Sequence, residues 1–271
     1  MLVTINDFSA QHTFDCGQCF RWQRLDDGSY LGVAGGRATR IFTDGNTADI
    51  DCSEEDYNNF WKNYLDAERD YSQIKKVLSV NDIMCEAISF GSGIRILRQE
   101  FHEALISFII SQRSSIPRIK TCVSRLCERF GEPISFHGQT LYAFPTVEVL
   151  ASLSESDFAN LGVGYRAQYL VDASRRLAEC EIDFDYLNTL DTQKAREELL
   201  KVRGVGDKVC DCVLLFSLGK YDLFPSDVWI KRVMKERFNE IDAKHAGESF
   251  FGEYSGFAQQ YLFYWRKFLE G

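Results

Sequence analysis

Apolar and polar side chains alternate over much of the first fifty residues, and this period of two is typical of strands with one buried face. The clearest run covers residues 20–25, and the pair Asp27-Gly28 after it is a hairpin-turn signal. The pattern predicts further short strands at 30–33 and 40–42. We therefore expect an antiparallel meander at the N-terminus, with one face buried.

From residue 54 onward, the period changes to that of helices. Aromatic side chains recur at helical spacing at Tyr57, Phe60, Trp61 and Tyr64, and the rest of the chain reads mainly as helices. Residues 91–93, Gly-Ser-Gly, mark the most economical boundary between the two patterns. The sequence therefore predicts an α+β fold with two domains: an N-terminal antiparallel β-sheet/α domain at 1–92 and a mostly helical domain at 93–271.

The composition indicates a folded protein of a reducing compartment. Hydrophobic residues make up 45% of the 271 residues and charged residues 26%, which is typical of globular chains. No apolar run approaches the ~20 residues that cross a bilayer, and residues 1–8 lack the features of a secretory signal. Nine scattered cysteines, an odd number, favour free thiols. We expect an intracellular protein without membrane contact, in the cytoplasm or nucleoid if it is bacterial and in the nucleus if it is eukaryotic. We also expect a monomer, because no feature of the sequence requires a larger assembly.

The net charge of −9 argues against a polyanionic partner, but the charges are unevenly distributed. Residues 94–130 carry a net charge of +4 and residues 201–237 a net charge of +3. Because only a local basic patch needs to face a polyanion, nucleic-acid binding remains open on charge alone.

The segment 199–212 contains the most informative motif. Gly204-Val205-Gly206 separates a helix predicted at about 192–201 from a second helix that begins at Asp207. Amides at the start of a helix lack intrahelical partners and can bind a phosphate oxygen. A tight glycine hairpin between two helices, followed by Lys208, is the pattern of a helix–hairpin–helix that grips a DNA backbone.

Lys208 and Asp227 are the candidate reactive side chains. Lys208 lies in the first turn of its helix, and a neutral lysine amine forms Schiff bases with carbonyl-level carbons. It could equally be a surface lysine or a cation that binds phosphate. Asp227 precedes a second helical pattern, which makes it a candidate N-cap. A capped carboxylate is also already oriented for electrostatic catalysis, so both roles can hold.

At these residues the chain resembles the helix–hairpin–helix DNA glycosylases, and more closely the 8-oxoguanine DNA glycosylase/AP lyase family. The resemblance extends over nearly the whole chain, in the family's order. The matching segments are 16–22 (CGQCFRW), 93–99 (GIRILRQ), 164–167 (GYRA), 204–212 (GVGDKVCDC), 225–228 (PSDV) and 256–263 (GFAQQYLF). Six segments in one order are far more specific than any one of them.

The resemblance implies excision of 8-oxoguanine from double-stranded DNA. In that family Lys208 is the nucleophile that forms a Schiff base at C1′, and Asp227 is the catalytic carboxylate. β-Elimination then cleaves the strand on the 3′ side. No organic cofactor and no catalytic metal are implied, although a structural monovalent or divalent cation at the hairpin 202–206 fits the pattern. Because no cysteine follows Cys212, the iron–sulfur branch of the superfamily is excluded.

The resemblance also implies a base pocket and a DNA-binding surface. A flipped base would be sensed by the Gly17 carbonyl and read by Gln259, between Phe263 and the Cys212 thiol. Tyr165 would fill the gap left in the duplex. The remaining DNA contacts are assigned to Arg113, Arg118, Arg166, Gly204, Val205, Gly206 and Trp229.

Two positions depart from the family pattern. Arg113 replaces an asparagine that helps to read the partner cytosine, so we expect weaker selectivity for the opposite base. Trp229 replaces a histidine that contacts phosphate, and its indole N–H can still donate but cannot become a cation. Two alternatives remain: an alkylated-base glycosylase that uses water as its nucleophile, and a non-enzymatic module that grips damaged or bent DNA.

Overall fold

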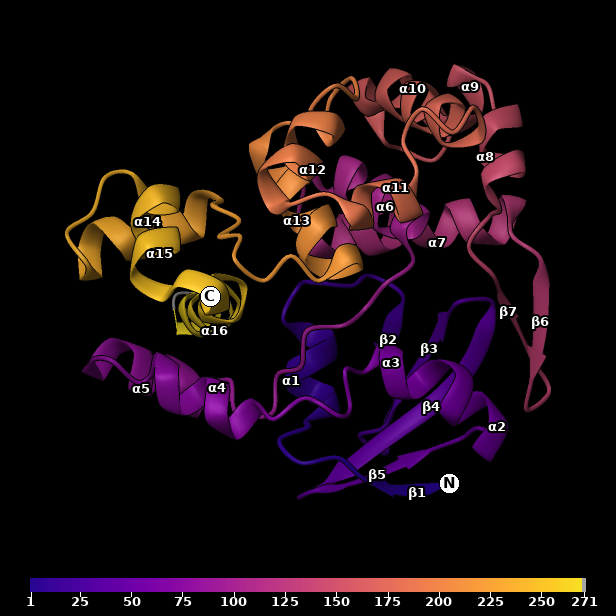
Figure 1. Ribbon diagram of the computed structural model, residues 1–271. Helices are drawn as coiled ribbons and strands as arrows, with labels where there is room; N and C mark the ends of the chain where they lie inside the picture. The colour runs from indigo at the N-terminus through magenta and orange to yellow at the C-terminus, as the bar shows by residue number, and fades with distance from the viewer. Residues whose placement is uncertain (270–271) are drawn as a thin grey trace.

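The computed structural model describes residues 1–269, with side chains to residue 266. A five-stranded antiparallel sheet packs below a larger assembly of helices (Figure 1). In the described part of the chain, no helix combines the length and the apolar character needed to cross a membrane. The α+β fold predicted from the periodicity is confirmed.

The N-terminal sheet has the strand order β1-β5-β4-β3-β2. Its strands are β1 (Leu2–Thr4), β2 (Trp22–Arg24), β3 (Tyr30–Ala34), β4 (Arg37–Asp44) and β5 (Thr47–Ile50). Every residue of β3 is buried, and α1 (Ala10–Asp15) packs against β3 and β4. Phe14 of α1 stacks on Trp22 with ring centroids 3.8 Å apart. The three strands predicted from sequence correspond to β2, β3 and β4.

The helical part begins with a helical segment from Glu54 to Tyr64, in which α2 (Glu54–Asp56), a π-helical turn (Tyr57–Trp61) and α3 (Lys62–Tyr64) follow one another. The helices that complete the fold are α4 (Tyr71–Leu78), α5 (Asp82–Phe90), α6 (Phe101–Ser111), α7 (Ile116–Phe130), α8 (Val147–Ser152), α9 (Glu155–Ala159), α10 (Ala167–Ala178), α11 (Phe184–Thr189), α12 (Thr192–Leu199), α13 (Asp207–Val213), α14 (Val228–Arg237), α15 (Ala243–Phe251) and α16 (Ser255–Leu269). A π-helical turn (Leu214–Leu218) extends α13, and short 3-10 turns precede α10 and α16.

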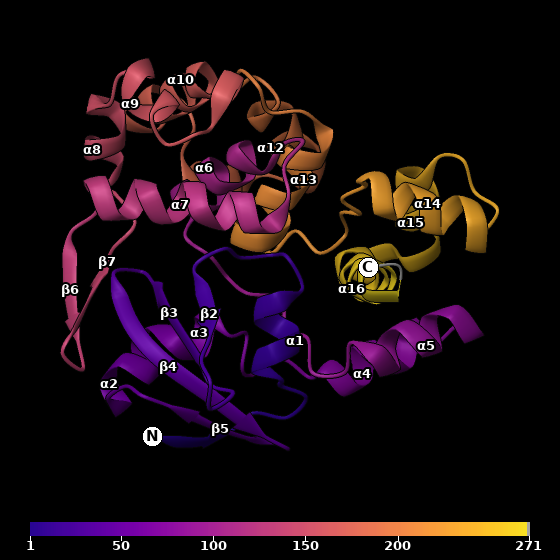
Figure 2. The same ribbon diagram turned by 180° about the vertical axis from the view of Figure 1, so that it is seen from behind.

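The buried residues form two cores, and their division bears on the predicted domain boundary. One core packs on the sheet and consists of residues between Ile5 and Leu65 in the sequence, together with Leu97. The other contains apolar residues of α4 and α5 together with those of α16. Helices α4 and α5 therefore pack with the C-terminal helix although they precede residue 92, as Figure 2 also shows from behind. The boundary at 92/93 remains a prediction.

Two features differ from what the sequence led us to expect. The strands β6 (Pro133–Phe136) and β7 (Gln139–Tyr142) form a separate hairpin between α7 and α8, within the part of the chain that the sequence pattern predicts to be helical. Arg95, counted in the first basic island, is fully buried rather than facing a partner. Its guanidinium donates to the carbonyls of Leu65 at 3.1 Å, Asn6 at 2.6 Å and Arg69 at 3.0 Å, so it ties loops together.

Candidate active site

The helix–hairpin–helix lies where the sequence places it, between α12 and α13. Gly204 has φ +83°, and a Cβ there would come within 2.3 Å of the Tyr169 ring, so the turn requires glycine. Val205 is buried and anchors the hairpin. Gly206 is the N-cap of α13 in an extended conformation, and a Cβ there would meet open space. The first amides of α13 are therefore accessible to an external anion.

Lys208 and Cys212 project from the same face of α13, four residues apart. The Lys208 ammonium lies 5.0 Å from the centroid of the Phe108 ring on α6. Burial raises the pKa of the Cys212 thiol to about 11, although the neighbouring Lys208 acts in the opposite direction. Cys212 is therefore a protonated thiol at neutral pH, held beside the candidate nucleophile.

Asp227 is the N-cap of α14, which confirms the capping role that the sequence predicts for it. Its Oδ1 accepts the backbone N–H groups of Trp229 and Ile230, both at 2.9 Å. The buried residues Phe224 and Pro225 precede it and fix the approach to the helix. The capping bonds hold the carboxylate in one orientation at the wall of the pocket that also contains Lys208.

The opposite wall comes from the loop after α1. Gly17 has φ +87°, a conformation that favours glycine, and a Cβ there would lie 3.1 Å from the Phe263 ring, closer than most side chains pack. Gln18 is fully buried, and its amide donates to the carbonyls of Thr13 and Arg95 at 2.9 and 2.8 Å. Gln260 of α16 donates to the Cys16 carbonyl at 2.9 Å. The Gln18 bonds hold the loop against α1 and against the segment before α6, and the Gln260 bond holds it against α16.

One pocket contains all six residues predicted for catalysis and base recognition: Gly17, Lys208, Cys212, Asp227, Gln259 and Phe263. Gln259 is almost fully buried, and its Oε1 has no hydrogen-bond partner among the described residues. A buried acceptor without a partner is costly, and a ligand with a donor would satisfy it. The cavity measures about 40 Å³, too small for a purine. Binding a base therefore requires side chains such as Phe263 to move.

A larger cleft of about 860 Å³ opens beside this pocket and shares Gly17, Lys208, Asp227 and Phe263 with it. Arg113 and Trp229 line the cleft. Arg113 is exposed and has φ +48°, a left-handed conformation that asparagine adopts more readily than arginine. The structure therefore places both departures from the family pattern at the entrance to the base pocket.

The remaining predicted DNA contacts lie outside the residues that line the pocket and the cleft. Tyr165 is 49% exposed in a 3-10 turn, as expected of a side chain that enters DNA. Arg118 is exposed and donates to the Gly162 carbonyl at 3.1 Å. Arg166 is buried and donates to the carbonyls of Val163 and Gln112. Reading of the partner base by Arg118 and Arg166 stays a prediction, because each side chain is engaged with backbone here.

In the described part of the chain, no three His, Cys, Asp or Glu side chains converge on a site that could hold a metal ion. A cation at the hairpin 202–206 would thus rely on backbone carbonyls. The Val202 carbonyl already accepts the Val205 amide at 3.0 Å. The hairpin cation stays a prediction.

Some contributions to the pocket could not be assigned from sequence. Phe108 and Phe216 line it, but each reads in the sequence as an ordinary apolar helix position. Gln99 supports it from behind: its amide donates to the Gln18 carbonyl at 2.8 Å, and its backbone N–H donates to the Phe216 carbonyl at 2.8 Å. A glutamine at an otherwise apolar position is a weak signal of such a buried support.

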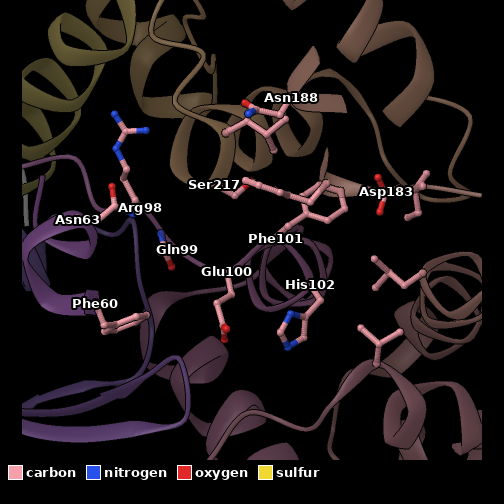
Figure 3. A pocket seen from close by; sticks show the side chains of 15 residues that line it. Phe60, Asn63, Arg98, Gln99, Glu100, Phe101, His102, Asp183, Asn188 and Ser217 are labelled. Atoms are coloured by element: carbon pink, nitrogen blue, oxygen red, sulfur yellow. The ribbon is translucent and has the colours of Figure 1, made fainter. Parts of the chain in front are cut away.

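A second cavity of about 510 Å³ lies behind this support, between the sheet domain and the helices (Figure 3). Phe60, Glu100, Phe101 and His102 line it, and Gln99 belongs to its wall. None of the predicted site residues faces this cavity. It is therefore distinct from the base pocket.

Family models match most of the chain. Residues 1–105 match the 8-oxoguanine DNA glycosylase N-terminal domain, and residues 106–250 match the HhH-GPD superfamily of base excision DNA repair proteins. Among curated relatives, the probable N-glycosylase/DNA lyase of Methanothermobacter thermautotrophicus is 35% identical over 63% of this chain. The chain spans only part of the length of these curated relatives: the match covers 62% of the Methanothermobacter protein, and a second match covers 42% of the Saccharomyces cerevisiae N-glycosylase/DNA lyase.

Two solved structures are similar to this chain over its full length. MBOgg1 in complex with a low-affinity DNA ligand is 42% identical, with a TM-score of 0.96 over 100% of this chain and 96% of that chain. The 8-oxoguanine glycosylase/lyase of Clostridium acetobutylicum, bound to DNA with cytosine opposite 8-oxoG, is 39% identical, with a TM-score of 0.95 over 100% and 99%. Together with the pocket that contains Lys208 and Asp227, these matches show that the chain belongs to the 8-oxoguanine DNA glycosylase family of the HhH-GPD superfamily.

Proposed function

We propose that this protein is a base-excision repair enzyme that removes 8-oxoguanine from double-stranded DNA and then cleaves the strand as an AP lyase. One observation carries the proposal: Lys208, Asp227, Gln259 and Phe263, from two helices and one helix cap, line a single pocket. A water-using glycosylase has no need of a lysine at that place. A DNA-binding module has no need of a pocket with a buried, unpartnered amide oxygen.

The proposed reaction begins with extrusion of the damaged nucleotide from the duplex, because C1′ is inaccessible inside the stack. The Lys208 amine attacks C1′ in its deprotonated form as the bond from C1′ to the base breaks, and a proton of the resulting cationic nitrogen passes to the departing base. The Asp227 carboxylate stabilises the positive charge that develops at C1′. The sugar ring then opens at the C1′–O4′ bond to give the Schiff base, and loss of a C2′ proton expels the 3′ phosphate. Lys208 and Asp227 supply both groups that this chemistry needs, so we propose neither an organic cofactor nor a catalytic metal.

Recognition of the lesion rests on the proton that oxidation places on N7. A backbone carbonyl accepts a hydrogen bond from this N7–H, whereas N7 of unmodified guanine has no hydrogen to donate. The left-handed conformation of Gly17 lets the base approach its carbonyl closely. Gln259 would read the Watson–Crick edge, while Phe263 and Cys212 would contact the two faces of the ring. At the entrance, Arg113 offers donors but no acceptor for a cytosine amino group, so we propose weak selectivity for the opposite base.

The test uses a duplex with a single 8-oxoguanine and a labelled damaged strand. We expect release of the free base together with strand cleavage on the 3′ side that leaves an unsaturated aldehyde end. Base release without cleavage would indicate the water-using glycosylase. Binding without release of any base would leave the DNA-binding module.

A further inference from the structure

The two catalytic side chains come from two parts of the molecule that meet at the base pocket. Lys208 and Cys212 belong to α13, which packs with α12 and α6. Asp227 belongs to the cap of α14, which packs with α15 and α16. In Figures 1 and 2 the helices α14, α15 and α16 form a separate group beside α13, joined to it by an irregular segment. The distance between nucleophile and carboxylate therefore depends on what fixes these two groups to one another.

A buried carboxylate lies at this junction. The Asp211 side chain on α13 is 1% exposed and accepts from two cations. Arg196 Nε of α12 lies 2.6 Å from Oδ1, and Lys244 Nζ of α15 lies 2.7 Å from Oδ2. The two cations differ in what they join: Arg196 binds within the helix–hairpin–helix, whereas Lys244 binds across the junction.

From Lys244 the connection continues to the catalytic carboxylate through close packing. One turn along α15, a Cβ on Gly247 would lie 2.4 Å from the ring of Phe224, so the helix backbone packs directly on that ring. Phe224 is fully buried and lies three residues before Asp227. Displacement of α15 would therefore displace the segment that ends in the Asp227 cap.

We propose that Lys244 is a positioning residue that, through its bond to Asp211, sets the distance between the Lys208 amine and the Asp227 carboxylate. The inference rests on the proposed function of these two side chains. Lys244 lies outside the residues that line the base pocket and the cleft. It acts on excision through the geometry of the two helix groups.

The arrangement separates positioning from folding. Without Lys244, Asp211 keeps the Arg196 bond, so the buried carboxylate is not left alone. Without Arg196, Asp211 keeps Lys244, and the bond across the junction survives. Arg196→Met is therefore the control for Lys244→Met, because both variants remove one cation from the same carboxylate. Each also removes a second, more exposed ion pair: that of Arg196 with Asp207 at 2.7 Å and that of Lys244 with Glu248 at 3.7 Å.

The experiment measures three quantities for each variant: the single-turnover excision rate on an 8-oxoguanine duplex, the affinity for a duplex with a stable abasic-site analogue, and the melting temperature. For Lys244→Met we expect excision to fall by about 10- to 100-fold, as misplacement by ~1 Å can do, while affinity changes less than about threefold. Lys244→Arg should retain most of the rate. Arg196→Met should lose stability but less of the rate, and Lys62→Met, which breaks the ion pair with Glu68 in the sheet domain, should match the wild type.

Excision by Lys244→Met within threefold of the wild type would overturn the proposal. So would a loss of rate matched by an equal loss of affinity, or an equal loss of rate in Arg196→Met, because either would show general disruption. If Lys244→Met does not fold, Lys244→Gln replaces it, because its amide nitrogen is one atom closer to the backbone than the lysine ammonium and cannot span the same distance to Asp211. We then expect a loss of excision rate greater than threefold with unchanged affinity, and a rate within threefold of the wild type would overturn the proposal. Inactivity of the wild type on 8-oxoguanine DNA would instead contradict the proposed function.

Discussion

Two helices begin at the active site, and their first turns are used in opposite ways. Helix α13 begins at Gly206, which has no side chain to accept its amides and leaves open space in front of them. Helix α14 begins at Asp227, whose carboxylate accepts two of its amides. The bare first turn can bind an anion of the substrate, whereas the capped one orients an anion of the protein. On the proposed function, a helix start serves DNA binding in α13 and catalysis in α14.

The largest effect is expected when the Asp227 charge is removed and its cap is kept. Asp227→Asn leaves an oxygen that can accept the amides of Trp229 and Ile230, but it can no longer stabilise positive charge at C1′. We expect single-turnover excision to fall by about 10²- to 10³-fold with little change in melting temperature. Asp227→Ala should also lose about 1 kcal/mol of unfolding free energy. Equal stability of the two variants would contradict the capping role.

A second change would convert the bare first turn into a capped one. Gly206 has an extended backbone, with φ −100° and ψ 178°, which suits an N-cap aspartate. Gly206→Asp should bind its own helix amides, raise stability by about 0.5 kcal/mol and weaken DNA binding by about tenfold at constant salt. Gly206→Ala is the control, since it adds a Cβ in open space without a charge. Unchanged DNA affinity in Gly206→Asp would show that these amides do not contact phosphate.

A smaller effect is expected at a third helix start, that of α7, where the Ser115 side chain makes no cap bond. Arg113, just before it, holds a left-handed conformation that asparagine prefers. Arg113→Asn adds an acceptor for the cytosine amino group, so the preference for cytosine over other opposite bases should rise by about fivefold, the equivalent of one hydrogen bond. Excision rates measured against the four opposite bases test this. A preference for cytosine that is unchanged or lower would refute it.

The smallest effect concerns the second turn of α13, where burial raises the pKa of Cys212 to about 11. Because the folded state keeps the thiol protonated, its reaction with iodoacetamide should be far slower at pH 8 than that of the exposed Cys85 and Cys180. A raised pKa also means that this thiol's contribution to stability is present below its ordinary pKa of 9.0 and is lost between pH 9 and 11. Alkylation of Cys212 as fast as that of Cys85 would contradict its burial.

The local part of the site could be predicted from the sequence. The hairpin glycines and Lys208 lie within one short segment, and Asp227 immediately precedes the helix that it caps. The spacing of four residues predicts a common helix face for Lys208 and Cys212, and both side chains line the pocket. The hairpin, the N-cap and the shared helix face each depend on residues close together in the sequence, so helical periodicity and capping rules are enough to predict them.

The long-range part could be reached only through the resemblance. Nothing in the pattern around Gly17 indicates that it lies beside Phe263, because the contact depends on Gln18 and Gln260 binding backbone carbonyls far away in the chain. The β6–β7 hairpin has a turn signal in His137-Gly138, both at positive φ. Strand β6 alternates between exposed and half-buried residues, but β7 does not, and four residues each are too few to predict a strand. Arg95 reads as a surface charge until its buried carbonyl partners are seen.

The central claim is that Lys208 attacks C1′, and reductive trapping tests it most directly. Borohydride reduces a lysine Schiff base to a stable bond, so the wild type on an 8-oxoguanine duplex should give a covalent protein–DNA adduct, and Lys208→Gln should give none. Asp227→Asn, which keeps the lysine, should still give an adduct on a pre-formed abasic site. An adduct of equal yield with Lys208→Gln, or base release by the wild type with no adduct, would contradict the account.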